Sequence, residues 1–152
     1  MPSEDIRWPV GGEIDILENR GRISNISSSA LHFGRQWNKK STLVGEALIP
    51  RQVRFQDKFH SISLVWKKNV IAFYLDNSSD PYFTINSNHP EFQKYKYPFN
   101  RDYYMILNVA VGGKYDDYWV DFDAFCNDEE CSNKEDPDSH RFIIDWIEYE
   151  RL

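Results

Sequence analysis

Three carboxylates lie close together in the run WPVGGEIDILE, residues 8–18: Glu13, Asp15 and Glu18. Side chains of a β-strand alternate between two faces, so Glu13 and Asp15 share one face, whereas Glu18 falls on the other. A β-bulge between Asp15 and Glu18 shifts the later side chains by one face and brings all three acids to the same side. A retaining glycosidase needs two carboxyl groups ~5–5.5 Å apart, one as nucleophile and one as acid/base. The spacing therefore predicts a bulged strand with three carboxylates on one face, and one interpretation of this row is that it is catalytic.

The middle acid of this row, Asp15, would share a proton with its neighbours and push their pKa values apart. The alternative interpretation is a solvated face on an edge strand, in which the three acids have no catalytic role. The spacing of the residues alone leaves both interpretations open.

The segments around this row predict strands and turns without a helix. Alternating apolar residues in FHSISLVW (59–66) and VIAFYLDN (70–77), joined by the turn KKN, predict a β-hairpin. YYMILNVAVGG (103–113) and RFIIDWIEYERL (141–152) predict two further strands, the last one covered on both faces. The segments 76–102 and 112–140 are polar and predict long connections, which are often functional.

The composition indicates one all-β domain or a part of one. The 152 residues are 41% hydrophobic and 16% aromatic, which excludes wholesale disorder. Strands at moderate spacing without helices indicate an antiparallel sandwich or barrel. The aromatic residues exceed what a small core needs, and flat rings suit a binding cleft because they offer contact area at low entropy cost.

The charge distribution excludes several partners. The net charge is −6, and residues 112–139 hold ten Asp and Glu against two Lys. An acidic chain without a basic stripe is a poor candidate for binding nucleic acid. No apolar run approaches the ~20 residues that span a membrane, so we expect no membrane partner.

Two cysteines, Cys126 and Cys131, lie in the acidic segment. Without a second pair or a nearby His they form a poor zinc site, so we expect a local disulfide and an oxidising compartment. The tripeptides 25–27 and 77–79 match the N-glycosylation pattern, which agrees with secretion. The chain start lacks the basic and apolar regions of a signal peptide.

The run WPVGGEIDILE resembles the signature of glycoside hydrolase family 16, in its laminarinase-like branch of endo-β-1,3-glucanases, which carries W-P-x-x-G-E-I-D-I-x-E. Further pieces follow in the order of the family: ALHFG, the FHSISLVW and IAFYLDN pair, PFNRDYYMILNVAVGG and IDWIEYER. The similarity covers residues 8–151, with a poor match in the acidic segment. It implies a β-jelly roll of two stacked antiparallel sheets with a substrate cleft across the concave face.

The resemblance also implies roles for individual residues. Glu13 would be the nucleophile that forms the glycosyl-enzyme, Glu18 the general acid and then base, and Asp15 the group that balances charge and proton in the row. Trp8 would stack on a sugar ring. His32, in LHFG, would line the cleft near the acid/base.

Other assignments rest on weaker matches. Asn108 would reach the cleft or, equally, make a hydrogen bond within its sheet. Trp37 and Trp119 could be further sugar platforms, although packing in core or loop is the safer interpretation. Asp145 occupies the place of a calcium ligand in many relatives, so the resemblance implies a structural calcium, while catalysis would need no cofactor.

Family members carry a substantial segment before the catalytic strand, whereas seven residues precede Trp8 here. We therefore expect residues 1–152 to be the C-terminal portion of a single catalytic domain whose N-terminal strands are missing. The leading hypothesis is an extracellular, monomeric enzyme that cleaves β-1,3-glucan internally with retention of configuration. The alternatives are a non-catalytic β-1,3-glucan-recognition lectin, a transglycosylase and an inactive remnant.

Overall fold

A computed structural model describes residues 1–121, 123 and 141–151 of the chain. It divides into two compact units, Met1–Ile106 and Leu107–Leu152, which are called the first and the second unit below.

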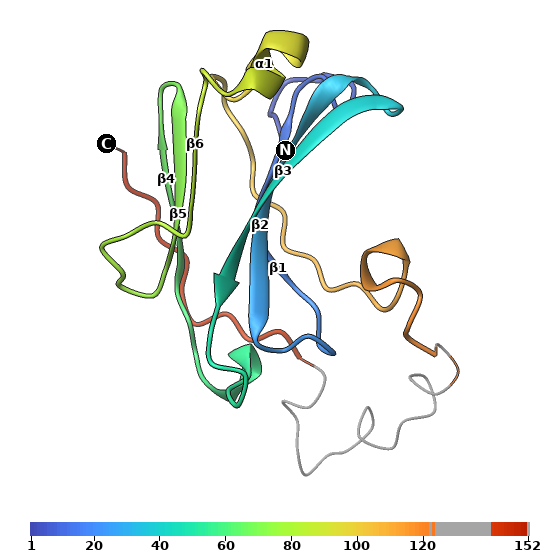
Figure 1. Ribbon diagram of the computed structural model, residues 1–152, viewed down its shortest axis with the longest axis vertical. Helices are drawn as coiled ribbons and strands as arrows, with labels where there is room; N and C mark the ends of the chain where they lie inside the picture. Colours follow the sequence, from blue (N-terminus) through green and yellow to red (C-terminus); the bar gives the residue numbers. More distant parts are fainter. Residues whose placement is uncertain (122, 124–140, 152) are drawn as a thin grey trace. The chain divides into compact units, whose positions relative to one another are not determined.

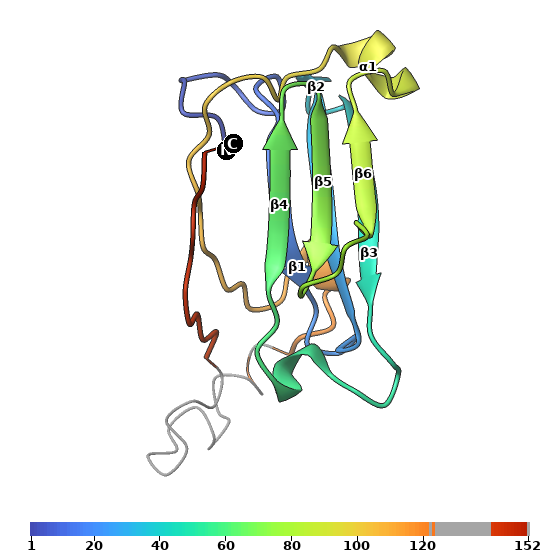
Figure 2. The same cartoon turned by 90° about the vertical axis from the view of Figure 1, so that its left-hand side faces the viewer.

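Two three-stranded antiparallel sheets make up most of the first unit (Figure 1). The first sheet has the order β1-β2-β3, and its strands are Glu13–Asn19, Ile26–Gln36 and Lys39–Leu48. The second sheet has the order β4-β5-β6, with strands Ile62–Lys67, Val70–Leu75 and Phe83–Asn86. Figure 2 shows the second sheet face on, with the strands of the first sheet behind it. This stacking confirms the all-β sandwich that the sequence predicts.

The predicted hairpin between FHSISLVW and VIAFYLDN is confirmed as β4 and β5. Leu64 lies opposite Phe73 and Trp66 opposite Ile71, so the apolar residues of both strands share one face. The turn follows Lys67 and contains Asn69 at a φ of 66°. Asn is one of the few residues other than Gly that adopts this left-handed conformation readily, which explains the turn at this place.

The hydrophobic core lies between the two sheets. Its buried members come from β2, β5, β6 and the segment after β6: Leu31, Phe33, Ile71, Phe73, Ile85, Phe92 and Phe99. Gly45 of β3 lets the sheets approach, because a Cβ at this position would lie 2.3 Å from the ring of Phe83. Leu31 and Phe33 point into this core. Ala30 and His32, which alternate with them along β2, therefore face the opposite side of the first sheet.

The segment 76–102 holds regular structure that the sequence did not predict. It contains β6 and a short helix, α1, at Pro90–Tyr95. His89 caps the helix by accepting a hydrogen bond from the Glu91 N–H, and Phe92 anchors it in the core. The helix ends where Lys96 adopts a φ of 65° and donates its N–H to the Phe92 carbonyl. A 3-10 turn, η1, at Phe55–Asp57 precedes β4.

Two predicted strands are wrong for the described part of the chain. Residues 104–111 and 141–151 form no strand, and Tyr103 forms an isolated bridge with Pro2. Tyr104 exchanges backbone hydrogen bonds with Met1, and no described ladder continues beyond it. A strand forms only where a neighbouring segment pairs with its backbone N–H and C=O groups, so an apolar run is not sufficient to form one.

The second unit contributes little regular structure among its described residues. A 3-10 turn, η2, spans Lys114–Asp116 and ends at Asp117 in the left-handed conformation. The predicted disulfide of Cys126 and Cys131 lies outside the described residues. Among the residues described, no helix is long and apolar enough to cross a membrane.

Candidate functional site

The predicted bulge is present in β1. Asp15 pairs with Ala30 of β2, whereas Glu18, three positions later, pairs with Ser28, only two positions away, and the register shifts between them. Two residues of β1 therefore lie between these pairs where β2 has one, as a β-bulge requires. The bulge that the spacing of the acids predicts is confirmed.

All three carboxylates lie on the face of the first sheet that points away from the core, which is called the open face below. Ile14 pairs with Leu31 and packs against the core, so the neighbouring pairs of β1 and β2 point the other way. Those pairs put each acid beside an even-numbered residue of β2: Glu13 with His32, Asp15 with Ala30, and Glu18 with Ser28.

Trp8 contacts the first acid of the row. Its indole Nε1 donates a hydrogen bond to Glu13 Oε2 at 2.5 Å. The indole N–H of Trp8 is a hydrogen-bond donor only, so the carboxylate of Glu13 is its acceptor in this contact. This contact fixes the orientation of Glu13 on the open face.

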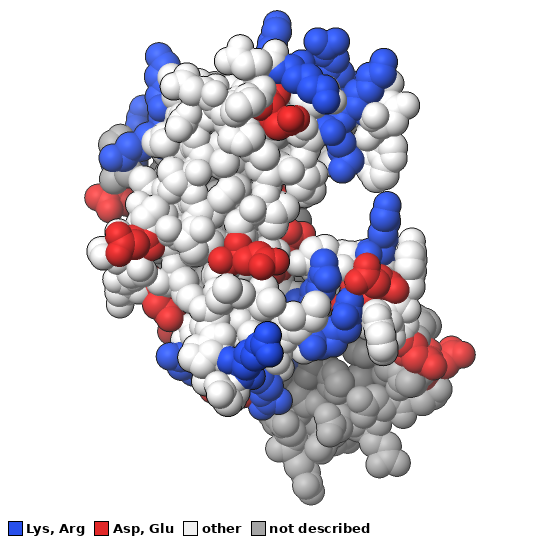
Figure 3. Space-filling model, in the orientation of Figure 1, with Lys and Arg blue, Asp and Glu red and all other residues white. Residues whose placement is uncertain are grey.

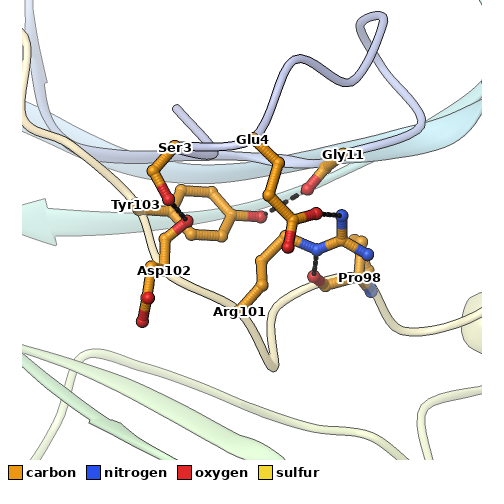
Figure 4. A network of polar contacts seen from close by, with 7 residues as sticks. All are labelled: Ser3, Glu4, Gly11, Pro98, Arg101, Asp102 and Tyr103. Atoms are coloured by element: carbon orange, nitrogen blue, oxygen red, sulfur yellow. Dashed lines mark hydrogen bonds and ion pairs between the residues drawn. The ribbon is translucent and has the colours of Figure 1, made fainter.

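Two glycines shape the turn that joins Trp8 to β1. Gly12 has a φ of 82°, and a Cβ there would lie 2.6 Å from the Tyr103 hydroxyl oxygen and 2.8 Å from Phe99. The Tyr103 hydroxyl donates to the Gly11 carbonyl at 2.6 Å, which ties the turn to the segment after α1 (Figure 4). Only glycine combines this backbone conformation with such close packing.

The same figure shows a second tie beside this turn. Arg101 donates through Nε to the Pro98 carbonyl at 2.9 Å and through Nη1 to Glu4 Oε2 at 3.2 Å (Figure 4). Ser3 donates its backbone N–H and its hydroxyl to the Asp102 carbonyl. These contacts hold the segment before Trp8 against residues 98–103.

His32 links the middle of the row to β3. Its Nε2 lies 3.2 Å from Asp15 Oδ2, and its Nδ1 lies 2.8 Å from the Thr42 hydroxyl oxygen. The hydrogen bond to Asp15, partly offset by burial, raises the pKa of His32 above its ordinary value. The imidazole therefore places positive charge beside Asp15 over a wider pH range than a free histidine would.

The surroundings of Glu18 favour the protonated form of its carboxyl group. Burial is the main cause that raises the pKa of Glu18, and the charge of Asp15 adds to it. A general acid works best when its pKa lies close to the working pH, so this environment suits proton donation.

Two tryptophans form an aromatic pair beside the row. The Trp8 and Trp37 rings lie 5.1 Å apart between centroids, and Lys40 Nζ lies 5.4 Å from the Trp8 centroid and 5.7 Å from the Trp37 centroid. Trp37 is 70% exposed, in the tip between β2 and β3. The sequence favoured packing in core or loop for Trp37, and the structure places it in an exposed loop where its ring packs against Trp8. Lys40 and Thr42 had no sequence signal, because only the β2–β3 register brings them to this face.

Two predicted site residues lie outside the first unit. Asn108 and Asp145 belong to the second unit, both are exposed, and neither lies in a strand. A contact between Asn108 and the carboxylates stays a prediction. No group of three or more Asp, Glu, His or Cys among the described residues could hold a metal ion. A calcium site at Asp145 stays a prediction.

Comparison with known proteins identifies the family of the chain. The family model for glycosyl hydrolases family 16 matches residues 1–123. A glucan endo-1,3-beta-glucosidase A1 of Niallia circulans is 34% identical over 125 residues, which are 76% of this chain and 18% of that protein. A beta-1,3-glucan-binding protein of Penaeus monodon is 32% identical over 126 residues, 70% of this chain and 34% of that protein.

The fold has a solved counterpart. A glycoside hydrolase family 16 endo-glucanase from Bacteroides ovatus, in complex with G4G3G-2F-DNP, superimposes with a TM-score of 0.53 at 23% identity. The match covers 66% of this chain and 42% of that one. The chain thus spans between about a fifth and two fifths of the length of these three proteins.

Proposed function

Because the chain belongs to glycosyl hydrolases family 16, we propose that it carries the catalytic row of an enzyme that cleaves β-1,3-glucan internally with retention of configuration. The observation that supports this proposal is the bulge in β1, which puts Glu13, Asp15 and Glu18 on one open face. Three acids in one row are electrostatically costly, and a two-carboxylate displacement gives a reason for them.

In this mechanism Glu13 attacks the anomeric carbon while Glu18 protonates the departing glycosidic oxygen. The bond between sugar and leaving group breaks, and a covalent glycosyl-enzyme forms on Glu13. Glu18, now ionised, then removes a proton from water, which attacks the anomeric carbon and releases Glu13. The raised pKa of Glu18 supports its assignment as the acid, and the Trp8 hydrogen bond supports Glu13 as the held nucleophile.

Asp15 would keep the two glutamates in different protonation states. Its charge favours the protonated form of Glu18, while His32 compensates part of that charge on the other side. The mechanism needs no cofactor, because each proton and the nucleophile come from side chains of the row.

Trp8 and Trp37 would bind sugar rings beside the row. An exposed indole offers an apolar face to the C–H face of a pyranose, and Trp37 is largely exposed. Trp8 would then serve twice, through its ring toward the sugar and through its N–H toward Glu13. Secretion, a monomeric state and the absence of nucleic-acid or membrane partners stay predictions.

The direct test is release of reducing ends from soluble β-1,3-glucan by the purified chain and by its Glu13→Gln and Glu18→Gln variants. We expect release by the chain and loss of at least about a thousandfold in each variant, since each removes one member of a catalytic pair. Glu46→Gln, which lies on the same face of β3, is the matched control and should keep full activity. Equal activity in the Glu13→Gln variant would contradict the proposal.

The second candidate is a β-1,3-glucan-recognition lectin on the same fold, favoured by the similarity to the glucan-binding protein of Penaeus monodon. The presence of both Glu13 and Glu18 favours hydrolysis instead. The lectin is supported if the unmodified chain shows no turnover while Glu13→Gln binds glucan with unchanged affinity. Products longer than the substrate would indicate transglycosylation through the same covalent intermediate.

A further inference from the structure

A groove of about 420 Å³ lies in the first unit beside α1, outside the carboxylate row. Four basic and two aromatic side chains contribute to its lining: Arg35, Lys94, Lys96, Arg101, Tyr95 and Tyr97. Figure 3 shows Lys and Arg gathered at the end of the first unit that carries α1. None of the described residues that line this cationic groove is acidic, although the chain as a whole has a net charge of −6.

Most of this positive charge is not neutralised within the unit. Arg101 is paired with Glu4 at 3.2 Å. In the part of the chain that the structure describes, no carboxylate forms an ion pair with Arg35, Lys94 or Lys96. Three like charges around one groove repel one another, and an anion placed among them would remove that repulsion.

Local contacts hold parts of the groove in place. Arg35 Nη2 donates a hydrogen bond to the Lys94 carbonyl oxygen at 3.4 Å. This bond uses one of the five N–H donors of the guanidinium and leaves the other four for a ligand. Lys94 Nζ lies 4.9 Å from the centroid of the Tyr95 ring. A guanidinium held in this way suits planar oxyanions such as carboxylates, and sulfate groups equally, because it donates two parallel hydrogen bonds.

The groove adjoins the carboxylate row along the chain. Gly34 lines the groove and lies two positions beyond His32 on β2, roughly 7 Å at the rise of a strand. Val10 also lines it and follows Trp8 by two positions. A saccharide that lies on the open face and reaches past the tryptophan pair would therefore meet the groove.

We propose that the cationic groove binds the sulfate or carboxylate group of an acidic saccharide whose neighbouring sugar rings occupy the open face. The inference rests on the proposed function for the position of the sugar rings. It extends the ligand class from a neutral glucan to one that carries an anionic substituent, which a row of carboxylates alone would repel.

The chain offers a variant that removes charge from the groove without harm to the fold. Lys96 ends α1 at a φ of 65°, where glycine is the preferred residue, so Lys96→Gly removes a cation and relieves the backbone. Arg35→Gln removes a second cation and keeps a donor for the Lys94 carbonyl. Lys58→Gln, an exposed position after η1, is the matched control.

The experiment measures dissociation constants for a β-1,3-linked glucose hexamer, the same hexamer with one terminal 6-sulfate, and inorganic sulfate. All variants carry Glu13→Gln, so that the ligands are not cleaved. We expect the sulfated hexamer to bind about tenfold tighter than the neutral one, as charge-assisted hydrogen bonds allow. The Arg35→Gln/Lys96→Gly pair should abolish this preference, Lys58→Gln should keep it, and raised salt should reduce it.

Three results would overturn the inference: no preference for the sulfated hexamer, a preference unchanged in the groove variant, or inorganic sulfate binding as tightly as the sulfated hexamer. Failure of the neutral hexamer to bind any variant would instead count against the proposed glucan substrate. The inference stands in that case if the sulfated hexamer still binds and the groove variant loses it.

Discussion

His32 lies opposite Glu13 in the β1–β2 ladder, yet its Nε2 contacts Asp15, 3.2 Å from Oδ2. The imidazole leans along the sheet to the diagonal neighbour, while its Nδ1 contacts Thr42 on the next strand. Glu13 is held from the other side by Trp8. Glu13 is thus held by Trp8 and Asp15 by His32, so the two acids have different partners.

We expect Asp15→Asn to lower the pKa of His32, because the hydrogen bond with Asp15 is the main cause that raises it. Titration of the imidazole protons by NMR measures this directly. Thr42→Val is the control, since it removes the partner of Nδ1 but leaves Asp15, and the pKa of His32 should stay raised. An unchanged His32 titration in Asp15→Asn would contradict the assigned cause.

The same shift predicts how stability depends on pH. A histidine whose pKa is raised on folding binds its proton more tightly in the folded state. Its stabilising contribution is therefore complete below the unfolded pKa of ~6.5 and is lost as pH rises through the folded pKa. The free energy of unfolding, from urea titrations between about pH 5 and pH 9, should fall with pH in the unmodified chain. A smaller slope is expected in Asp15→Asn, and a steeper one would refute this account.

Asp15→Asn should also lower the pKa of Glu18, because the charge of Asp15 is the second cause that raises it, after burial. If Glu18 is the general acid, the alkaline limb of kcat/KM moves to lower pH in this variant. The measurement is a pH–rate profile on soluble β-1,3-glucan. Glu46→Gln, on the same face, should leave the profile unchanged, and an alkaline limb that moves upward would argue against Glu18 as the acid.

Trp8→Phe should reduce kcat/KM by about 10- to 100-fold, the range that loss of a hydrogen bond to a charged group produces. The phenyl ring keeps an aromatic face, whereas the donor to Glu13 Oε2 is lost. Trp37→Phe is the comparison, because Trp37 contacts the Trp8 ring without a hydrogen bond to any acid of the row. A larger loss of activity in Trp37→Phe than in Trp8→Phe would contradict the role of the indole N–H.

Tyr97→Phe should leave the chain as stable or make it more stable. The Tyr97 hydroxyl oxygen is buried without a hydrogen-bond partner, and burial raises the pKa of Tyr97 to about 12. Removal of an unpaired buried hydroxyl relieves a desolvation cost of about 1–3 kcal/mol. Thermal unfolding should show an equal or higher midpoint, whereas Tyr103→Phe, which loses the bond to the Gly11 carbonyl, should lower it.

The sequence by itself determined those elements that show a regular spacing of polar and apolar side chains. The parity of Glu13, Asp15 and Glu18 predicted the bulge, because no regular strand can place all three on one face. The alternation of residues 62–75 predicted β4 and β5 in the same way. Local chemistry also explains Gly12 of the motif, whose φ of 82° is a backbone conformation that other residues rarely adopt.

Tertiary structure decided what depends on a partner from elsewhere in the chain. The contact of His32 with Thr42, the pairing of Trp8 with Trp37 and the convergence of cations beside α1 all follow from register and chain path. Residues 104–111 are an almost continuous apolar run that also predicted a strand, yet they form none among the described residues. The order of apolar and polar side chains is a property of the segment itself. The backbone hydrogen bonds that make it a strand also require a neighbouring segment, which only the tertiary structure supplies.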